Sequence, residues 1–420
     1  MSGRFPILSL ALRSIGNRAG TALLTILTVA ISVTLFLGVE KVRHGARASF
    51  ENTIAGVDLI VGARSSPVNL LLYSVFHIGE ATNNITWESY QSVAGAPGVA
   101  WTVPVSLGDS HRGYRVVGTT PAYFEHYQYG DGRPVRFADG AAFEDLFEAV
   151  VGAEVARELG YSIGEEIVVA HGMGSVSFVE HDNNPFTVTG VLAPTGTPLD
   201  RSVFVGLEAI EAIHLEGATG AGTSLSADDL RTRDLAPEQI TAFYVGLTSP
   251  VAALRLQRQV NTYPDEPLQA VLPGVALAQL WSVVGAAERT LAAVAAFVVA
   301  VGLVSILTAI LTSLNERRRE MAILRALGAR PHHVFALLVA ESAMLALAGA
   351  VIGTALTYGG LAVGAPLIEA RFGLLLPGLL PGLYDLAIIA LVTLAAAVLG
   401  LLPAWRAYRN SLADGMTVRL

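Results

Sequence analysis

Residues 315–334, NERRREMAILRALGARPHHV, place a dense arginine cluster between two long apolar segments. A run of about 20 apolar residues can cross a bilayer as a helix. Arginines next to such helices collect on the cytoplasmic side of the membrane. The arrangement therefore predicts an integral membrane protein with an inner loop that a partner inside the cell can contact.

Four apolar segments are long enough to span a bilayer: residues 19–39, 291–314, 334–363 and 386–402. Arginines flank them unevenly, at positions Arg4, Arg13, Arg18, Arg317, Arg318, Arg319, Arg325, Arg330, Arg406, Arg409 and Arg419, against Arg371 alone between the last two segments. This bias predicts that both termini and the central loop are cytoplasmic. Residues 40–285 then lie outside and are too long for a loop, which predicts a folded domain. A cleavable signal peptide is the less favoured alternative, because the first apolar run is longer than a usual signal core.

The composition supports this class: 52% of residues are hydrophobic, 15% are charged, and the mean hydropathy is +0.53. A formal net charge of −8 does not suggest a nucleic-acid partner. The absence of cysteine excludes disulfides and thiolate sites. Lys41 is the only lysine, and Glu40 precedes it, so the sequence holds no Gly-Lys-Ser/Thr phosphate loop. We therefore expect no cofactor on this chain, with any ATP bound by a partner subunit.

The segment 40–285 has the pattern of a mixed α/β domain. Strand-like runs occupy residues 99–105, 114–118, 166–170, 186–192 and 202–205, and helical patterns occupy 144–159 and 252–262. Residues 217–237 have little apolar content, which predicts a mobile loop that is either a surface insertion or a partner-docking loop. Residues 275–287 are apolar at helical spacing, so we expect the second span to begin outside the membrane as a stalk.

The apolar stretch at residues 62–79, GARSSPVNLLLYSVFHIG, has two interpretations. It is either a core strand or helix of the domain, or an apolar lip at the membrane surface that meets a hydrophobic substrate. The core interpretation is favoured.

Candidate chemistry is sparse. His111, His126, His171 and His181, with Asp182, carry zinc-ligand atoms but lack a tight ligand spacing, so scattered histidines are the better interpretation. No GxSxG motif is present, and we do not expect an enzyme. His332 and His333 fit an interface better than a metal site.

Two features of the third span suggest specific roles. Glu341 is an ionisable residue near its start, and it is either an interface anchor or part of a path that transmits movement. Gly349 and Gly353 form a small-xxx-small pair that permits close helix contact, in a packed or dimeric bundle.

The central loop itself predicts a short amphipathic helix. Met321, Leu324 and Leu327 recur at three-residue spacing, with Ile323 beside them. Gly328 and Pro331 are typical of a helix stop. The residues alone leave two roles open, a lipid anchor and a docking helix.

The same loop resembles the ER-x-x-E-x-x-x-x-R-A-x-G-A…E signature of the FtsX/MacB/LolC-type permeases, the type VII ABC superfamily. The matching residues are Glu316, Arg317, Glu320, Arg325, Ala326, Gly328, Ala329 and Glu341. The N-terminal run ALRSIGNRAGTALLTILTVAISV is similar to the amphipathic elbow and first span of that family, and LLPAWRAYRNSLADGMTVRL resembles its tail, except that Asp414-Gly415 replaces the usual Asp-Pro.

This resemblance implies a fold with an elbow helix at residues 1–18, a first span at 19–39, a periplasmic α/β domain with stalk at 40–285, and a three-helix membrane domain at 286–420. It implies a coupling helix at 315–331 that contacts a separately encoded ABC ATPase through Glu316, Arg317, Glu320, Ile323, Leu324, Arg325, Leu327 and Gly328, with Glu341 in the transmission path. Further implied partners are a second permease subunit in a homo- or heterodimer, a periplasmic protein, and membrane lipids.

The implied function is that of an inner-membrane permease subunit that moves its outer domain when the ATPase hydrolyses ATP, and so exports or extracts an amphiphilic substrate such as a lipoprotein, peptide or drug-like molecule. The alternative is an FtsX-like signalling scaffold that activates a periplasmic partner. ATP-dependent loss or release of a substrate would separate the two.

Overall fold

The chain divides into two compact units in a computed structural model that describes residues 11, 13–16, 18–51, 53–171, 184–218, 226–326, 329–372 and 381–409. One unit comprises Met1–Gly45, Ala286–Leu367 and Leu376–Leu420 and is called the membrane unit below. The other comprises Ala46–Gly285 and Ile368–Leu375 and is called the inserted domain. Most of the predicted elbow helix at residues 1–18 lies outside the described residues.

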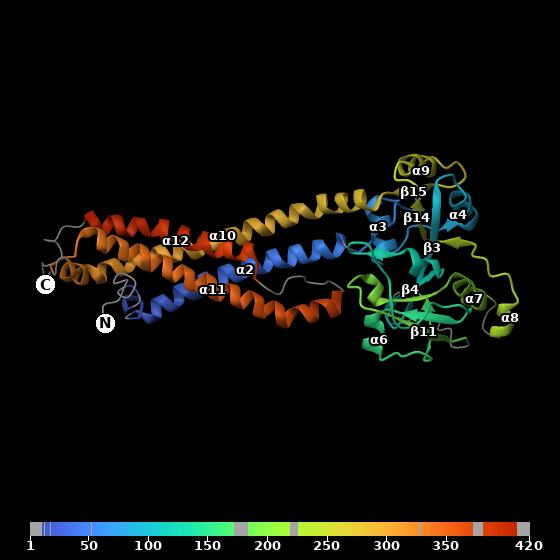
Figure 1. The fold of residues 1–420 in the computed structure, drawn as a ribbon, viewed down its shortest axis with the longest axis horizontal. Helices are drawn as coiled ribbons and strands as arrows, with labels where there is room; N and C mark the ends of the chain where they lie inside the picture. Colours follow the sequence, from blue (N-terminus) through green and yellow to red (C-terminus); the bar gives the residue numbers. More distant parts are fainter. Residues whose placement is uncertain are drawn as a thin grey trace. The chain divides into compact units, whose positions relative to one another are not determined.

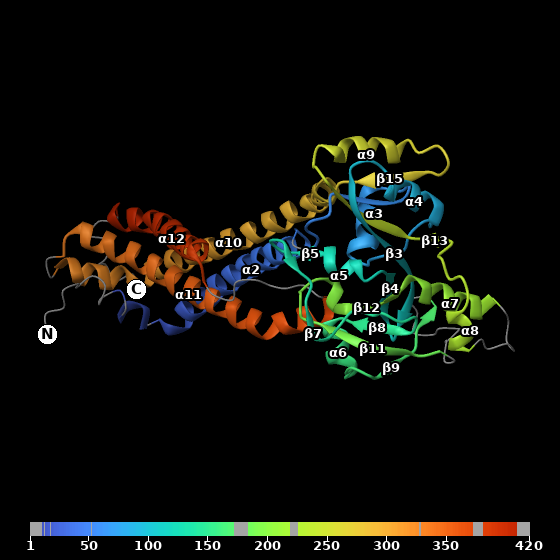
Figure 2. The same ribbon diagram turned by 45° about the vertical axis from the view of Figure 1, so that its right-hand side comes forward.

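The membrane unit is a bundle of four long helices (Figures 1 and 2): α2 (Ala19–Glu51), α10 (Pro273–Ala326), α11 (Pro331–Phe372) and α12 (Leu383–Arg409). Each contains an apolar segment long enough to cross a membrane, at Ala19–Gly45, Pro273–Thr312, His332–Leu367 and Leu383–Trp405. Large apolar side chains are exposed on all four helices, as a lipid-facing surface requires. The four predicted spans are therefore confirmed, and each is longer than its apolar pattern indicated.

Helix α10 is continuous over 54 residues. At 1.5 Å per residue this is about 81 Å, against about 30 Å for the hydrocarbon core of a bilayer. The helix begins within the inserted domain and passes through the second span without a break. Residues 275–287 are helical as predicted, while their role as a moving stalk stays a prediction.

The inserted domain is built on a mixed sheet whose strand order is β15-β1-β14-β3-β4-β12-β8-β11-β7. The β4–β12 and β8–β11 pairs are parallel and the remaining pairs are antiparallel. The strands of this path are β1 (Leu59–Ala63), β3 (Val99–His111), β4 (Tyr114–Thr119), β7 (Phe137–Gly140), β8 (Glu148–Val151), β11 (Phe186–Leu192), β12 (Ser202–Gly206), β14 (Ala242–Leu247) and β15 (Leu268–Val271). The shorter strands are β2 (Ile85–Thr86), β5 (Gln128–Tyr129), β6 (Arg133–Pro134), β9 (Glu166–Ile167), β10 (Ala170–His171) and β13 (Gln239–Ile240).

Helices cover both faces of this sheet. They are α3 (Pro67–Val75), α4 (Trp87–Ala94), α5 (Ala122–His126), α6 (Ala153–Leu159), α7 (Leu207–Ala218), α8 (Ala227–Arg231) and α9 (Ala252–Asn261), with a 3₁₀ turn at Pro198–Arg201. Along β1, Ile60 packs into one apolar cluster and Leu59 and Val61 into another, so both faces of that strand are buried. Figure 2 shows α9 beside β15, and α7 contacts β4 and β12. The predicted mixed α/β class is confirmed.

Four of the five predicted strand runs coincide with β3, β4, β11 and β12, whereas residues 166–170 divide into β9 and the start of β10. The helix predicted over residues 144–159 is wrong in its first half. Residues Glu148–Val151 form β8, which pairs with β11 and β12, and only Ala153–Leu159 is helical. Val150 and Val151 favour a strand, and Gly152 separates the two elements.

The apolar stretch at residues 62–79 belongs to the core. It contributes the end of β1 and helix α3, whose Leu70, Leu71, Tyr73 and Val75 are at most 1% exposed. Ser66 caps the helix by accepting a hydrogen bond from the backbone N–H of Asn69 at 3.0 Å. The alternative of an apolar lip for a substrate is therefore wrong at these positions.

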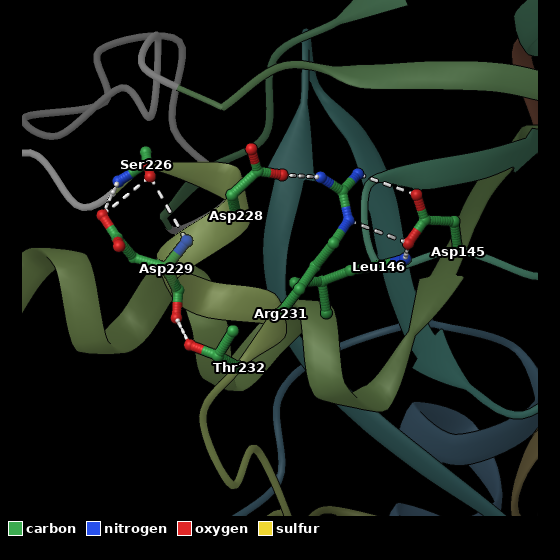
Figure 3. A network of polar contacts seen from close by, with 7 residues as sticks. All are labelled: Asp145, Leu146, Ser226, Asp228, Asp229, Arg231 and Thr232. Carbon is green, nitrogen blue, oxygen red and sulfur yellow. Dashed lines mark hydrogen bonds and ion pairs between the residues drawn. The ribbon is translucent and has the colours of Figure 1, made fainter.

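Polar contacts hold residues 226–232 of the predicted loop at 217–237 (Figure 3). Within its described part, Ser226 and Asp229 form a reciprocal capping box at the start of α8. Arg231 then donates to Asp145 at 2.7 Å and to Asp228 at 3.0 Å. These contacts attach α8 to the loop before β8, so a freely mobile segment is not supported over residues 226–232.

Candidate functional site

The predicted coupling segment is the end of a longer helix. Residues 315–326 are helical and continue α10 without a break, while Leu327 and Gly328 lie outside the described residues. Ile323 is 53% exposed, as expected for a side chain that meets a partner. The side chains of Glu316, Arg317, Glu320, Leu324 and Arg325 are not described, so their roles stay predictions.

Pro331 begins the next helix rather than ending the previous one. It is the first residue of α11, a position where its missing N–H and fixed φ are favourable. The backbone N–H of Arg330 donates to Nδ1 of His333 at 3.1 Å, and the N–H of His333 donates to the carbonyl of Arg330 at 2.9 Å. His332 and His333 thus lie in the first turn of α11, beside the segment that the resemblance assigns to coupling.

Glu341 is buried, with 5% of its surface exposed, ten residues into α11. Its neighbour Ser342 packs closely on α12, because a Cβ added at Gly400 would clash with the Ser342 hydroxyl. Ser342 also donates to the carbonyl of Leu338 at 3.0 Å. Glu341 is therefore buried next in sequence to a residue that contacts α12, and its burial fits both the anchor and the transmission hypotheses.

The small-xxx-small pair of α11 packs within the chain. A Cβ added at Gly349 would lie 2.6 Å from Cβ of Val29, and one added at Gly353 would lie 2.6 Å from the carbonyl oxygen of Ala30. Thr34 on α2 donates to the carbonyl of Gly353 at 3.0 Å. These glycines therefore bring α2 and α11 of the same chain together. Of the two options that the sequence left open, this contact favours a packed bundle over a dimer contact.

A polar cluster joins three helices at the end of the bundle where α12 begins. Asp385 is fully buried, and its Oδ2 accepts hydrogen bonds from Nζ of Lys41 at 3.2 Å, the hydroxyl of Tyr358 at 2.7 Å and the N–H of Gly382 at 2.7 Å. The Lys41 ammonium also lies 5.4 Å from the centre of the Tyr358 ring. We call Lys41, Tyr358 and Asp385 the three-helix clamp. Sequence reasoning missed it, although the solitary lysine and an aspartate at the start of a span were available signals.

A second ionic group involves residues of α2 on both sides of Lys41. Arg43 donates to Glu40 of its own helix at 2.6 Å, and it approaches Glu288 of α10 at 3.8 Å. His44 lies 2.9 Å from the same Glu40 carboxylate. This group gives an ionic contact between α2 and α10, and the Arg47 guanidinium lies 5.6 Å from the ring centre of Trp281 on α10.

His111 and His126 of the inserted domain make structural contacts, and the side chain of His171 in β10 is not described. His111 contacts the carbonyl of Val168 at 2.6 Å and the hydroxyl of Tyr161 at 2.8 Å, and burial lowers its pKa. His126 stacks on Trp101 with ring centres 4.5 Å apart. Within the described residues no group of three or more metal-ligand side chains gathers, and His181 and Asp182 lie outside them.

Comparison with known proteins assigns both parts of the chain. Residues 22–263 match the MacB-like periplasmic core domain family, and residues 292–412 match the FtsX-like permease C-terminal family. The first match alone covers more than half of the 420 residues.

Two curated relatives agree with these matches. The macrolide export ATP-binding/permease protein MacB of Azoarcus sp. is 25% identical over 84% of this chain and 51% of its own length. The pyoverdine export ATP-binding/permease protein PvdT of Pseudomonas syringae is 25% identical over 77% of this chain and 47% of its own length. The crystal structure of the periplasmic region of MacB from Actinobacillus actinomycetemcomitans aligns at 10% identity with a TM-score of 0.34, over 54% of this chain and 94% of that one. The chain spans about half the length of the curated relatives that it matches.

The four membrane helices, the mixed α/β domain between the first two and the two family matches agree with one another. They describe a multi-pass inner-membrane protein. The chain belongs to the FtsX/MacB-type family of ABC transporter permeases.

Proposed function

We propose that this permease subunit converts ATP hydrolysis by a separate ABC ATPase into movement of its inserted domain. The observation that carries the proposal is the unbroken helix α10, which begins at Pro273 in the inserted domain and ends at Ala326 in the predicted coupling segment. A continuous helix is stiff along its axis, so a displacement at one end is carried to the other. ATP binds to the partner and no cofactor is held by this chain.

The coupling contact is assigned to the end of α10. Ile323 is exposed there, and Leu324 and Leu327 complete the apolar stripe that the sequence predicts. An exposed apolar stripe on a helix end is the form that a groove-binding contact takes. Glu316, Arg317, Glu320, Arg325 and Gly328 flank this stripe, and Glu341 carries the displacement into α11. Two such permease subunits pair in the assembly, with both termini and the coupling segment on the cytoplasmic side.

The substrate class is an amphiphile. Support comes from the relatives, whose names assign them macrolide export and pyoverdine export. The apolar segment that the sequence offered as a substrate lip gives no support, because its Leu70 and Leu71 are buried in the domain core. A signalling scaffold that activates a periplasmic partner remains the alternative, and the match of residues 292–412 to the FtsX-like family suits it equally. An ATP-dependent loss of a macrolide from loaded vesicles supports export, whereas a change only in a partner's activity supports the scaffold.

The coupling assignment is tested by co-purification with an ABC ATPase subunit from the same organism. The double variant Leu324→Asp, Leu327→Asp places two charges in an apolar contact, which costs more than about 2 kcal/mol and lowers recovery of the ATPase by more than about tenfold. Val251→Asp is the matched control, because Val251 is 82% exposed in the inserted domain. Equal recovery of the ATPase with the double variant and with the wild-type chain would contradict the assignment.

A further inference from the structure

The contacts among the membrane helices are unequal in kind. Close backbone approach occurs on α10 as well, because a Cβ added at Gly302 would lie 2.8 Å from Oγ of Ser32 on α2. Within α2, α11 and α12 such approach is combined with polar bonds between the helices. Gly353 lies against Ala30, and Thr34 donates to the Gly353 carbonyl at 3.0 Å. Gly400 lies against Ser342. These are directional contacts that fix the register of one helix on another.

The three-helix clamp strengthens the same set of helices. Asp385 on α12 is fully buried and is held by Lys41 of α2 and Tyr358 of α11. Separating α2 from α12 would leave this carboxylate buried without its cation, and an uncompensated buried charge is strongly unfavourable. The clamp therefore resists any movement that parts these three helices.

Helix α10 is attached differently. Its ionic contact to α2 is Arg43 to Glu288 at 3.8 Å, and Arg43 already has its short contact, 2.6 Å, with Glu40 of its own helix. If this contact opens, Arg43 keeps Glu40, and the Glu288 side chain is 17% exposed, against 0% for Asp385 in the clamp. Apolar packing by side chains such as Ile306 and Ile310 adds dispersion contacts, each of which is weak. Trp281 of α10 also contacts Arg47 and Phe50 of α2 through its ring. The buried share of the most apolar window is 22% in α10, 28% in α12 and 39% in α2 and α11.

From this asymmetry we propose that α2, α11 and α12 form a fixed frame, with Lys41, Tyr358 and Asp385 as positioning residues, and that α10 is the helix that shifts against this frame during the ATP cycle. The inference rests on the proposed function, since it names the moving part within it. The Arg43–Glu288 contact is then exchanged during the shift, while the clamp stays closed.

Two disulfides at the same level of α2 test the proposal, because the chain has no other cysteine. Ser32→Cys with Gly302→Cys joins α2 to α10, where an added Cβ lies 3.3 Å from Cβ of Ser32. Val33→Cys with Gly353→Cys joins α2 to α11, where the same distance is 2.9 Å. Both pairs need only a small separation of the helices to reach the roughly 3.5–4.5 Å that a disulfide prefers.

The readout is ATP hydrolysis by the complex with its ATPase subunit in lipid nanodiscs, oxidised and then reduced. Each reduced variant is the reference for its own oxidised form, because both forms carry the same added side chains. The comparison therefore isolates the effect of the cross-link from that of the substitutions.

The expected result is a loss of about tenfold or more in ATP hydrolysis when the α2–α10 disulfide forms, recovered on reduction, and a change of less than about twofold for the α2–α11 disulfide. An α2–α11 disulfide that inhibits as strongly, or an α2–α10 disulfide without effect, overturns the frame proposal while leaving the permease function intact. If neither the wild-type chain nor the reduced variants support ATP hydrolysis with any ATPase subunit, the proposed function itself fails.

Lys41 and Arg43, two cations of α2, provide a second test whose expected result a loss of folding would not produce. In the double variant Val33→Cys, Gly353→Cys, the rate of disulfide formation is measured with and without ATP in three backgrounds: no further change, Lys41→Met and Arg43→Met. A fixed frame predicts that ATP does not alter the rate in the unchanged and Arg43→Met backgrounds and alters it in the Lys41→Met background. A rate that responds to ATP in the unchanged background, or that stays insensitive in Lys41→Met, contradicts the role of the clamp.

Discussion

Substitution of the glycines on α11 provides a matched test of the membrane packing. An alanine Cβ at Gly353 would lie 2.6 Å from the Ala30 carbonyl oxygen and 2.9 Å from Cβ of Val33, whereas nothing lies within 4 Å of a Cβ at Gly359. Both substitutions add the same methyl group to the same helix. Gly353→Ala is expected to destabilise the bundle and Gly359→Ala is not.

The magnitude follows from these distances. To reach an ordinary separation of about 3.4 Å or more, α2 and α11 must move apart by roughly 0.5–0.8 Å, and a gap of that size forfeits a quarter to a half of each nearby dispersion contact. The hydrogen bond from Thr34 to the Gly353 carbonyl, now 3.0 Å, lengthens as well, at a cost of about 0.6 kcal/mol. Together with strain of about 1–3 kcal/mol for an overpacked site, Gly353→Ala should lower the free energy of unfolding by about 2 kcal/mol.

Gly359→Ala gains helix propensity of up to about 1 kcal/mol instead. Equilibrium unfolding by sodium dodecyl sulfate in mixed micelles, followed by circular dichroism, measures both variants. Gly349→Ala should behave like Gly353→Ala, because its Cβ would lie 2.6 Å from Val29. Equal stability of Gly353→Ala and Gly359→Ala would refute the close packing of α2 on α11.

Three further outcomes concern the inserted domain. Burial, aided by Arg115, lowers the pKa of His77 to about 3. The unfolded chain therefore takes up a proton at a higher pH than the folded chain, and stability falls as the pH drops from about 6.5 toward 3, by at most about 1.4 kcal/mol per pH unit. Asparagine tolerates the positive φ of 55° at this position, so His77→Asn should flatten this slope in thermal unfolding scans, and an unchanged slope would contradict the assignment. Tyr127→Phe removes a buried donor to the Thr53 carbonyl at 2.6 Å and should lower the free energy of unfolding by about 1–3 kcal/mol, a loss that denaturant titration would detect. Gly152→Ala would place a Cβ in collision with the backbone oxygen of Leu199 and should lower the yield of folded protein extracted in detergent. A yield equal to the wild-type level would show that this contact is not tight.

The membrane architecture could be predicted from the sequence because a span must be apolar over its whole length. Strands β3, β4, β11 and β12 could also be predicted from the sequence, since β-branched residues bounded by turn residues indicate them. The inserted domain was harder to predict where the local sequence pattern favours one element and the pairing in the folded sheet requires another. Residues Glu148–Val151 continue a helical pattern in sequence but pair with β11 and β12 in the sheet.

Long-range contacts explain what sequence reasoning missed. The short strands β1, β14 and β15 belong together only because segments far apart in the chain pair with one another. The three-helix clamp is of the same kind, since Lys41 and Asp385 are 344 positions apart. Helix α8 differs, because the capping box of Ser226 and Asp229 is a local signal in the sequence. The prediction of a mobile loop used the low apolar content of this segment and did not use that signal.

The account is tested most directly by following the inserted domain while the partner hydrolyses ATP. A single cysteine introduced at Val251, which is 82% exposed in a chain without other cysteines, takes a fluorescent or spin label at one defined place. With an ABC ATPase subunit bound in lipid nanodiscs, the label signal should change on addition of ATP, and Leu324→Asp with Leu327→Asp should abolish the change. A signal that ignores ATP while the complex hydrolyses it, or that changes equally in the double variant, would contradict coupling through the end of α10.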